Sequence, residues 1–114
     1  MMKRLAFFEG AIRPGRAAEF DAYVTDRLVP LWTQFPGAAR VEVLREVEAE
    51  DGSHRYPMVL EITYPNRAAI ENALASPVRA QSREVTKGLL EFFDGRIFHV
   101  VYRLAAHDAA AAGG

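Results

Sequence analysis

The order of the apolar patterns constrains this chain more than any other feature of its sequence. Alternating apolar residues, typical of strands, mark four segments, which are residues 3–12, 39–48, 56–64 and 96–104. Apolar residues at helical spacing mark three more, which are residues 16–34, 66–75 and 76–93. The sequence therefore predicts the order strand, helix, strand, strand, two helix segments, strand.

Local signals support the ends of the helices. Pro30 lies inside the first helix and is expected to kink or divide it, because proline has no backbone N–H to donate. Asn66 is a suitable N-cap for the short second helix. Ser76 and Pro77 together are typical of a new helix start, with serine as the cap and proline at the first position.

This order predicts a ferredoxin-like βαββαβ fold of the α+β class, with a four-stranded antiparallel sheet and helices on one face. Residues 1–104 are expected to form a single domain, since the chain has only 114 residues. Residues 105–114, rich in alanine and glycine, are expected to be a disordered tail.

The two faces of the predicted sheet differ in polarity. We expect the helices to cover one set of side chains, which is Ala6, Phe8, Ile12, Val41, Val43, Val47, Met58, Leu60, Ile62, Tyr64, Phe98, Val100, Tyr102 and Leu104. The opposite set is then Leu5, Phe7, Glu9, Glu42, Leu44, Glu46, Val59, Glu61, Thr63, Ile97, His99, Val101 and Arg103. This second set contains too many apolar side chains to face water.

A homodimer is the simplest way to cover that second face. Burial of its apolar side chains would stabilise a dimer by several kcal/mol, at roughly 25 cal/mol per Å² of apolar surface. Two sheets packed face to face would make a dimeric α/β barrel with a partly polar interior. The alternative is a monomer whose second face is merely mixed.

Composition excludes several function classes. The formal net charge is -1, which gives no reason to expect nucleic acid or an anionic membrane as a partner. The chain has no cysteine, which excludes disulfides and thiolate catalysis and fits a cytoplasmic location. His54, His99 and His107 do not have metal-ligand spacing, and there is no glycine-rich phosphate loop, so no metal and no cofactor are expected.

Several motifs together resemble the dimeric α/β-barrel superfamily, and within it the EthD-like group. They are Pro30-Leu31, Phe35-Pro36-Gly37, residues 56–64, Leu74-Ala75-Ser76-Pro77 and Phe98-His99-Val100-Val101-Tyr102. The resemblance extends over nearly all of residues 1–104. It implies a homodimer with a cavity between the sheet and the helices, in a superfamily that includes cofactor-free monooxygenases, lactone isomerases and haem-degrading enzymes.

The resemblance to the EthD-like group implies binding of a small apolar or aromatic organic molecule, in the breakdown or modification of such compounds. The chain departs from the group at Leu28, where EthD-like sequences commonly carry histidine. One alternative is a cofactor-independent monooxygenase or isomerase that uses His99 and Glu61 for proton transfer. Another is a structural or interaction protein without a small ligand.

His99 and Glu61 are the candidate catalytic residues. A neutral imidazole with Glu9 or Glu61 as its partner can act as a general base near neutral pH. A carboxylate in a half-apolar cavity has a raised pKa and can also move protons. The alternatives are a structural hydrogen bond for His99 and an ion pair with Arg103 or Arg45 for Glu61.

The candidate ligand-binding residues are the polar and aromatic side chains expected near the same cavity. They are Phe7, Glu9, Tyr23, Arg27, Thr63 and Arg103. Tyr23, Arg27 and Trp32 lie off the main apolar stripe of the first helix and can stack on a flat ligand at a cavity mouth. The alternative is that these three side chains cover an edge of the core or of the dimer.

Overall fold

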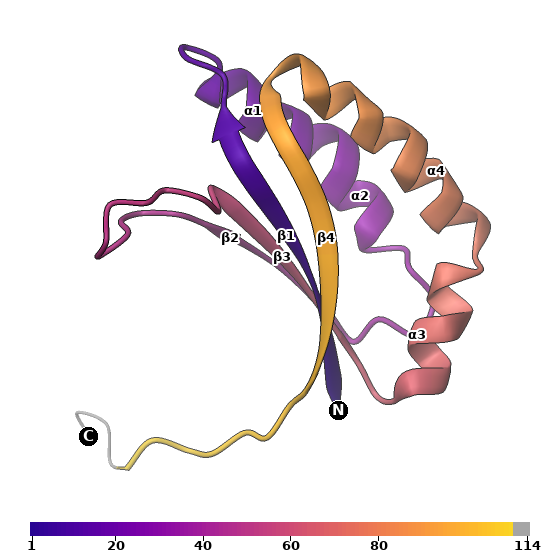
Figure 1. Ribbon diagram of the computed structural model, residues 1–114. Helices are drawn as coiled ribbons and strands as arrows, with labels where there is room; N and C mark the ends of the chain where they lie inside the picture. The colour runs from indigo at the N-terminus through magenta and orange to yellow at the C-terminus, as the bar shows by residue number, and fades with distance from the viewer. Residues whose placement is uncertain (111–114) are drawn as a thin grey trace.

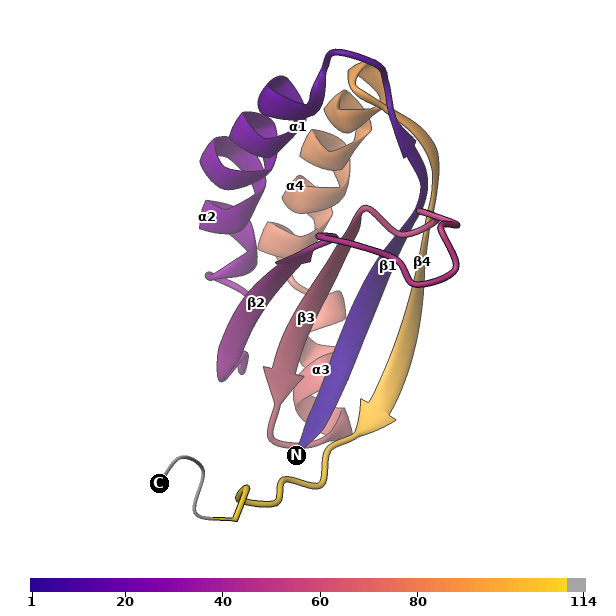
Figure 2. The same cartoon turned by 90° about the vertical axis from the view of Figure 1, so that its left-hand side faces the viewer.

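Four strands form one antiparallel sheet in the computed structural model, which describes residues 1–110. The strands are β1 (Met2–Ile12), β2 (Arg40–Arg45), β3 (Met58–Tyr64) and β4 (Phe93–Arg103). Their order in the sheet is β2–β3–β1–β4, so the first strand lies between the third and the last (Figure 2). This topology confirms the predicted ferredoxin-like α+β fold.

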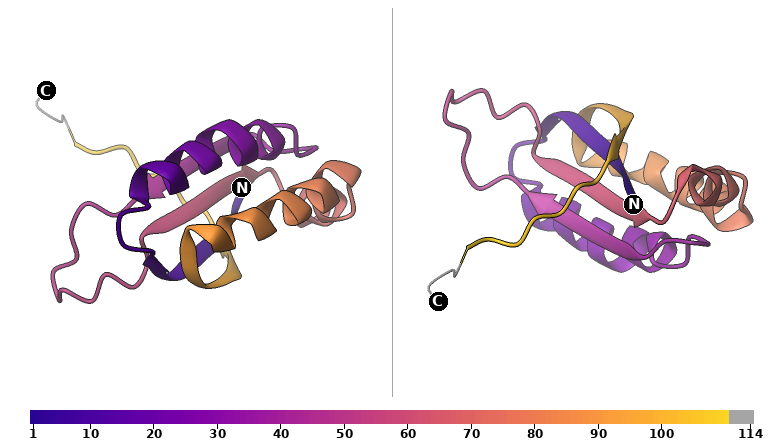
Figure 3. Two further views of the ribbon diagram at one scale, coloured as in Figure 1. Left: turned by 90° about the horizontal axis from the view of Figure 1, so that it is seen from above. Right: turned by 90° about the horizontal axis from the view of Figure 1, so that it is seen from below.

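All the helices lie on one face of the sheet (Figure 1). They are α1 (Ala17–Tyr23), the π-helical turn η1 (Val24–Leu28), α2 (Val29–Trp32), α3 (Arg67–Leu74), α4 (Pro77–Thr86) and the 3-10 turn η2 (Lys87–Glu91). Seen from above, α1 and α2 run beside α4 in a single layer (Figure 3). Within residues 1–110, every helix is too short or too polar to cross a bilayer.

The helix starts follow the sequence signals. The Asn66 side chain accepts a hydrogen bond from the Ala69 backbone N–H at 2.9 Å, and the Ser76 hydroxyl accepts one from the Arg79 N–H at 3.3 Å. Each cap satisfies an N–H that has no partner inside its helix. These two caps confirm the predicted starts of α3 and α4.

The first helix is divided, as predicted, and the division is the π-helical turn η1 between α1 and α2. Pro30 cannot donate a backbone hydrogen bond, and its ring crowds the carbonyl of the preceding turn. The chain accommodates this proline by forming the π-helical turn η1 immediately before α2. Val24 and Leu28 in that turn are fully buried, so the wider turn still faces the core.

The core fills the space between the sheet and the helices. Its largest fully buried side chains come from β1, β3, β4, α1, η1 and η2 and are Tyr64, Phe8, Phe20, Phe93, Leu28, Met58, Leu89 and Val24. Their positions agree with the predicted helix-facing sets of β1 and β3. Leu28, the position at which the sequence departs from the expected pattern, is one of these core residues.

The predicted facing of the last strand is wrong. Ala6 of β1, which faces the helices, pairs with His99, whereas Phe7 on the other face pairs with Phe98. Directly paired residues share a face, so His99, together with Ile97 and the other odd-numbered residues of β4, faces the helices. Apolar residues occur in both halves of this strand, so alternation alone does not decide which half faces the helices.

Some predicted boundaries are also wrong. Strand β2 ends at Arg45, and Val47, expected to face the helices, is 95% exposed beyond its end. Phe93, expected in the last helix, is instead the first residue of β4, where it pairs with Ile12. Residues 105–110 of the predicted tail contain no helix or strand, and residues 111–114 lie outside the described part of the chain.

The face of the sheet without helices, here called the open sheet face, is concave and bare (Figures 1 and 2). Its apolar side chains are Leu5, Phe7, Leu44, Val59, Phe98, Val100 and Tyr102. Phe7 and Phe98 stack with ring centroids 5.2 Å apart, and Tyr56 packs edge-on against Phe7. The sequence pattern predicts Ile97 and Val101 on this face, and the structure has Phe98, Val100 and Tyr102 there instead. The open sheet face is therefore still apolar.

Candidate functional site

The main cavity of the described chain lies between the sheet and α4 and has a volume of about 730 Å³. About half of its wall is apolar, and this part includes Ala6, Phe8, Trp32, Phe35, Leu60, Ile62 and Ile97. These side chains come from the sheet and from the end of the first helix. A space of this size and character suits a small organic molecule.

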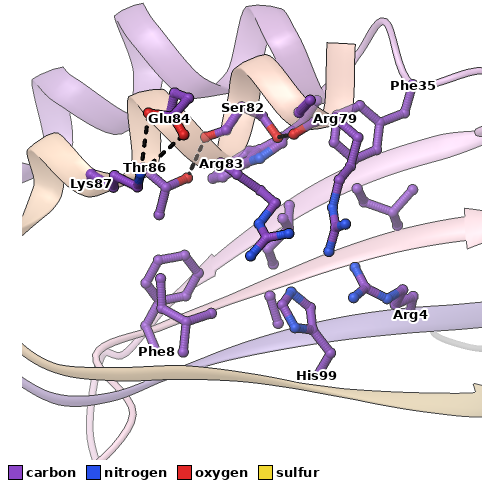
Figure 4. Close-up of a pocket in the computed structure, with 16 residues that line it drawn as sticks. Arg4, Phe8, Phe35, Arg79, Ser82, Arg83, Glu84, Thr86, Lys87 and His99 are labelled. Carbon is purple, nitrogen blue, oxygen red and sulfur yellow. Dashed lines mark hydrogen bonds and ion pairs between the residues drawn. The ribbon is translucent and has the colours of Figure 1, made fainter. Parts of the chain in front are cut away.

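Three arginine side chains enter this cavity beside His99 (Figure 4). Arg4 projects from β1 on the same face as Ala6, and Arg79 and Arg83 project from α4 toward the sheet. Arg79 and Arg83 are four residues apart, which places them on one side of the helix. Here Arg4, Arg79 and Arg83 are called the arginine cluster.

The arginine cluster has no counter-charge within residues 1–110. No hydrogen bond or ion pair joins any of its three guanidinium groups to a residue in that range. Glu84 is the one carboxylate in the cavity wall, and it pairs with Lys87 at 2.9 Å. The cavity therefore has an excess of positive charge.

Burial and repulsion between neighbouring positive charges lower the pKa values of Arg4 and Arg79. Burial lowers the pKa of Arg4, and the nearby charge of Arg79 lowers it further. Burial also lowers the pKa of Arg79, with a further contribution from Arg83. Arg4 and Arg79 still carry their charge at neutral pH, because an arginine pKa starts far above that range.

His99 is neutral at physiological pH. Burial of its ring, followed by the charges of Arg4, Arg79 and Arg83, lowers its pKa from 6.5 to about 4. The residue remains partly exposed, so solvent screens part of the repulsion from the arginines. No hydrogen bond within residues 1–110 occupies its ring nitrogens, so one of them is free to accept a proton or a hydrogen bond.

The hydroxyl groups in the cavity wall are already used. Ser82 donates its hydroxyl proton to the Arg79 carbonyl at 2.8 Å, and Thr86 donates to the Ser82 carbonyl at 2.7 Å. These local bonds leave neither side chain placed as an activated nucleophile. Residues 1–110 also contain no group of three or more histidine, aspartate or glutamate side chains able to hold a metal ion.

The structure separates His99 from its expected carboxylate partners. Glu61 lies on the open sheet face, where Lys3 donates to it at 2.9 Å. Glu9 lies on the same face and pairs with Arg96 at 2.6 Å. The predicted pairing of His99 with Glu9 or Glu61 is therefore wrong, because the phase of β4 puts the imidazole on the other side of the sheet.

The remaining expected ligand-binding residues also lie outside the cavity wall. Phe7 belongs to the open sheet face, as does Thr63, whose buried hydroxyl finds no hydrogen-bond partner in the described chain. Tyr23 donates its phenol proton to the Val85 carbonyl at 2.7 Å, and the Arg27 guanidinium lies over its ring. Arg103 is exposed at the end of β4.

Trp32 does line the cavity. It is the one residue among Tyr23, Arg27 and Trp32 that lies where the sequence analysis expected all three, at a cavity. Of the candidate catalytic and ligand-binding residues, only His99 lines the cavity too. Sequence reasoning missed the whole arginine cluster. The sequence does contain a signal for it, which is the spacing of Arg79 and Arg83 at i and i+4 of one helix. Like charges at that spacing destabilise a helix, so their presence indicates that the two side chains have another role.

Comparison with known proteins adds information about the fold. No protein-family model matches the sequence, and no curated protein matches it. An EthD family protein from Bacillus halodurans c-125 superposes with a TM-score of 0.72 at 19% identity, over 92% of this chain and 99% of that one. A dimeric ferredoxin-like protein of unknown function from Jannaschia sp. CCS1 gives 0.64 at 19% identity, over 90% and 98%.

A variant of SnoaB, a cofactor-independent oxygenase from Streptomyces nogalater, also superposes on the chain. Its TM-score is 0.62 at 19% identity, over 96% of both chains. Identities this low carry the fold and not the activity. The chain therefore shares its ferredoxin-like fold, over nearly its whole length, with an EthD family protein and a cofactor-independent oxygenase.

Proposed function

We propose that this protein binds a small organic molecule in the cavity between the sheet and α4. The observation that carries the proposal is the cavity itself, a space of about 730 Å³ in which one half of the wall is apolar and the other half polar, with Arg4, Arg79, Arg83 and His99 in the polar half. Binding sites for small molecules usually combine a mostly apolar surface with a few polar groups that fix orientation. A role in the breakdown or modification of small organic compounds agrees with the fold shared with EthD family proteins and SnoaB.

The proposal includes a homodimer joined through the open sheet face. That face presents stacked aromatic rings and aliphatic side chains that no helix covers. Ion pairs lie around the apolar part, among them Lys3 with Glu61 and Arg96 with Glu9. A dimeric ferredoxin-like protein with the same fold supports this arrangement. A cytoplasmic location stays a prediction.

Filling the cavity tests the binding site. Ala80 is an exposed residue of α4 that lines the cavity, and Gln81 beside it is exposed but does not. We expect Ala80→Phe to weaken binding of naphthalene-2-carboxylate or naphthalene-2-carboxamide about tenfold or more, because its ring would occupy the ligand's space. Gln81→Phe is the matched control and should leave the affinity unchanged.

Trp32 provides the signal for this experiment. It is the only tryptophan of the chain and lies in the cavity wall, so its indole N–H gives a single NMR resonance at the site. We expect either probe to shift this resonance. If neither probe shifts it at millimolar concentration, or if Ala80→Phe and Gln81→Phe bind alike, the cavity is not a ligand site, and a structural or interaction role is the better explanation.

Proton transfer by His99 is a second candidate function. It is favoured by one observation, a neutral imidazole in the cavity next to three guanidinium groups. The imidazole can take a proton from an acidic C–H group, while the guanidinium groups stabilise the resulting enolate. Glu61, the other expected proton-transfer residue, has no part in this proposal, since it lies on the open sheet face.

The exchange of an acidic C–H group with deuterated water tests this second function. We expect the protein to accelerate exchange at the central carbon of 1-phenylbutane-1,3-dione, as followed by proton NMR. His99→Gln should abolish the acceleration and keep the binding, because glutamine does not act as a base. Equal exchange rates for the two proteins would leave binding as the only function of the cavity.

A further inference from the structure

We propose that the molecule bound in this cavity is an organic carboxylate, with its anionic group held by the arginine cluster and an apolar body of one or two rings against the apolar wall. This inference deepens the proposed function and rests on it. It names the chemical class of the ligand, which neither the fold nor the cavity volume specifies.

The unpaired charges are the first argument. Charged side chains withdrawn from water are normally paired, because desolvation is costly. Arg4 and Arg79 are both half-buried, and their pKa values are lowered by burial and by the neighbouring positive charge. Neither finds a carboxylate within residues 1–110, although other arginines of this chain, such as Arg45 and Arg96, pair with one. A ligand anion would supply the missing partner.

The placement of the arginine cluster is the second argument. Its members come from two elements on opposite sides of one cavity, Arg4 from the sheet and Arg79 and Arg83 from α4, and their guanidinium groups point toward a common space (Figure 4). A basic surface stripe would point outward from one element. This convergence from two sides is the geometry of a site that surrounds an anion.

The chemistry of the wall selects the class of anion. A guanidinium group is planar and makes two parallel hydrogen bonds to a carboxylate. The apolar half of the wall offers Phe8, Trp32 and Phe35 together with aliphatic side chains, which suit an aromatic or aliphatic ring system. His99 is neutral and therefore adds a hydrogen bond without adding charge.

A pair of probes of equal shape tests the inference. Naphthalene-2-carboxylate and naphthalene-2-carboxamide differ in charge and hardly in size. We expect the carboxylate to bind about tenfold or more tightly than the amide, because hydrogen bonds to charged groups are the stronger ones. The affinities can be measured by calorimetry and from the Trp32 indole resonance.

Variants of the arginine cluster complete the test. We expect Arg79→Gln to reduce the affinity for the carboxylate about tenfold and to leave the affinity for the amide nearly unchanged. Arg67→Gln is the matched control, since Arg67 is exposed in the first turn of α3 and does not line the cavity. It should change neither affinity. Circular dichroism and the melting temperature verify that each variant is folded.

Each remaining outcome overturns a specific statement. If the amide binds as tightly as the carboxylate, or if Arg79→Gln and Arg67→Gln behave alike, the inference fails while binding in the cavity stands. If inorganic phosphate displaces the carboxylate at equal concentration, the cluster recognises small anions in general, and the assigned class is wrong. If Ala80→Phe weakens neither probe, the proposed function fails as well.

Discussion

At the scale of single residues, the cavity concentrates groups that oppose folding. Arg4, Arg79 and Arg83 repel one another and lower the pKa of His99, and no acidic residue within 1–110 offsets them. Substituting such groups commonly stabilises a protein at the expense of its function. This conflict between local stability and charge is the strongest residue-level indication of a binding site.

The lowered pKa of His99 has a consequence for stability at acid pH. The imidazole titrates near 6.5 in the unfolded chain and at about 4 in the folded one. Between these values the unfolded state binds more protons, so the folded state loses stability as the pH falls from 6.5 toward 4. Below the folded pKa the loss stops.

We expect His99→Gln to reduce this acid sensitivity. The variant has no imidazole at position 99, so its free energy of unfolding should fall less than that of the wild type between pH 6.5 and about 4. Urea unfolding at several pH values measures the difference. His54 and His107 are present in both proteins and cancel in the comparison. Parallel curves for the two proteins would show that the folded His99 titrates normally.

At the scale of elements, the contact between the first helix and η2 depends on one glycine. A Cβ atom at Gly88 would fall on the hydroxyl group of Tyr23, which donates to the Val85 carbonyl. The side chain of Tyr23 therefore belongs to the packing between helices. This explains why a tyrosine off the main apolar stripe lines no ligand site here.

We expect Gly88→Ala to destabilise the protein by about 1–3 kcal/mol, because the added methyl group overpacks a filled contact. Alanine is otherwise favoured over glycine in helical segments, so a merely local effect would have the opposite sign. In a Tyr23→Leu background the same substitution should cost less, since the phenol is gone. Urea unfolding of the four proteins gives the coupling energy, and a value near zero would contradict the contact.

Strand β4 shows where element-level reasoning from sequence stops. Its existence follows from the alternation of residues 96–104, but its facing depends on pairing with β1. A shift of one residue moves every side chain of a strand to the other face. The sequence prediction put His99 on the same face as Glu61. The observed facing of β4 differs by one residue and places His99 in the cavity with the arginine cluster.

At the scale of the whole molecule, one side of the sheet is covered by helices and the other is bare (Figure 1). The open sheet face includes Leu44, which is 46% exposed, and Tyr102, which is 49% exposed. A contiguous apolar face of this kind usually marks an interface. The homodimer proposed above covers it and leaves the cavity of each protomer on the outer side of the sheet.

A pair of identical substitutions on opposite sides of the molecule tests the homodimer. We expect Leu44→Glu to weaken dimerisation about tenfold or more, since it introduces a charge into an apolar contact. Leu90→Glu is the control, because Leu90 is 56% exposed in η2 on the helix side. Analytical ultracentrifugation over a range of concentrations measures both. A wild type that remains a single chain at micromolar concentration would refute the dimer.

The amino-acid sequence alone was enough to predict the order of elements, the caps at Asn66 and Ser76, the disturbance at Pro30 and the fold class. These depend on periodicity and on signals within a few residues, which the chain carries locally. It also indicated His99 and Trp32, a histidine and an aromatic side chain in otherwise apolar patterns.

Which residues share a site became clear from the three-dimensional arrangement of the chain. Arg4 and Arg79 are 75 positions apart in the numbering of the chain, and no local pattern shows that both enter one cavity. Their meeting depends on the register of β1 within the sheet and on the packing of α4 over it. Register and packing are set by contacts between distant segments, so the site could be identified only after the fold had brought them together.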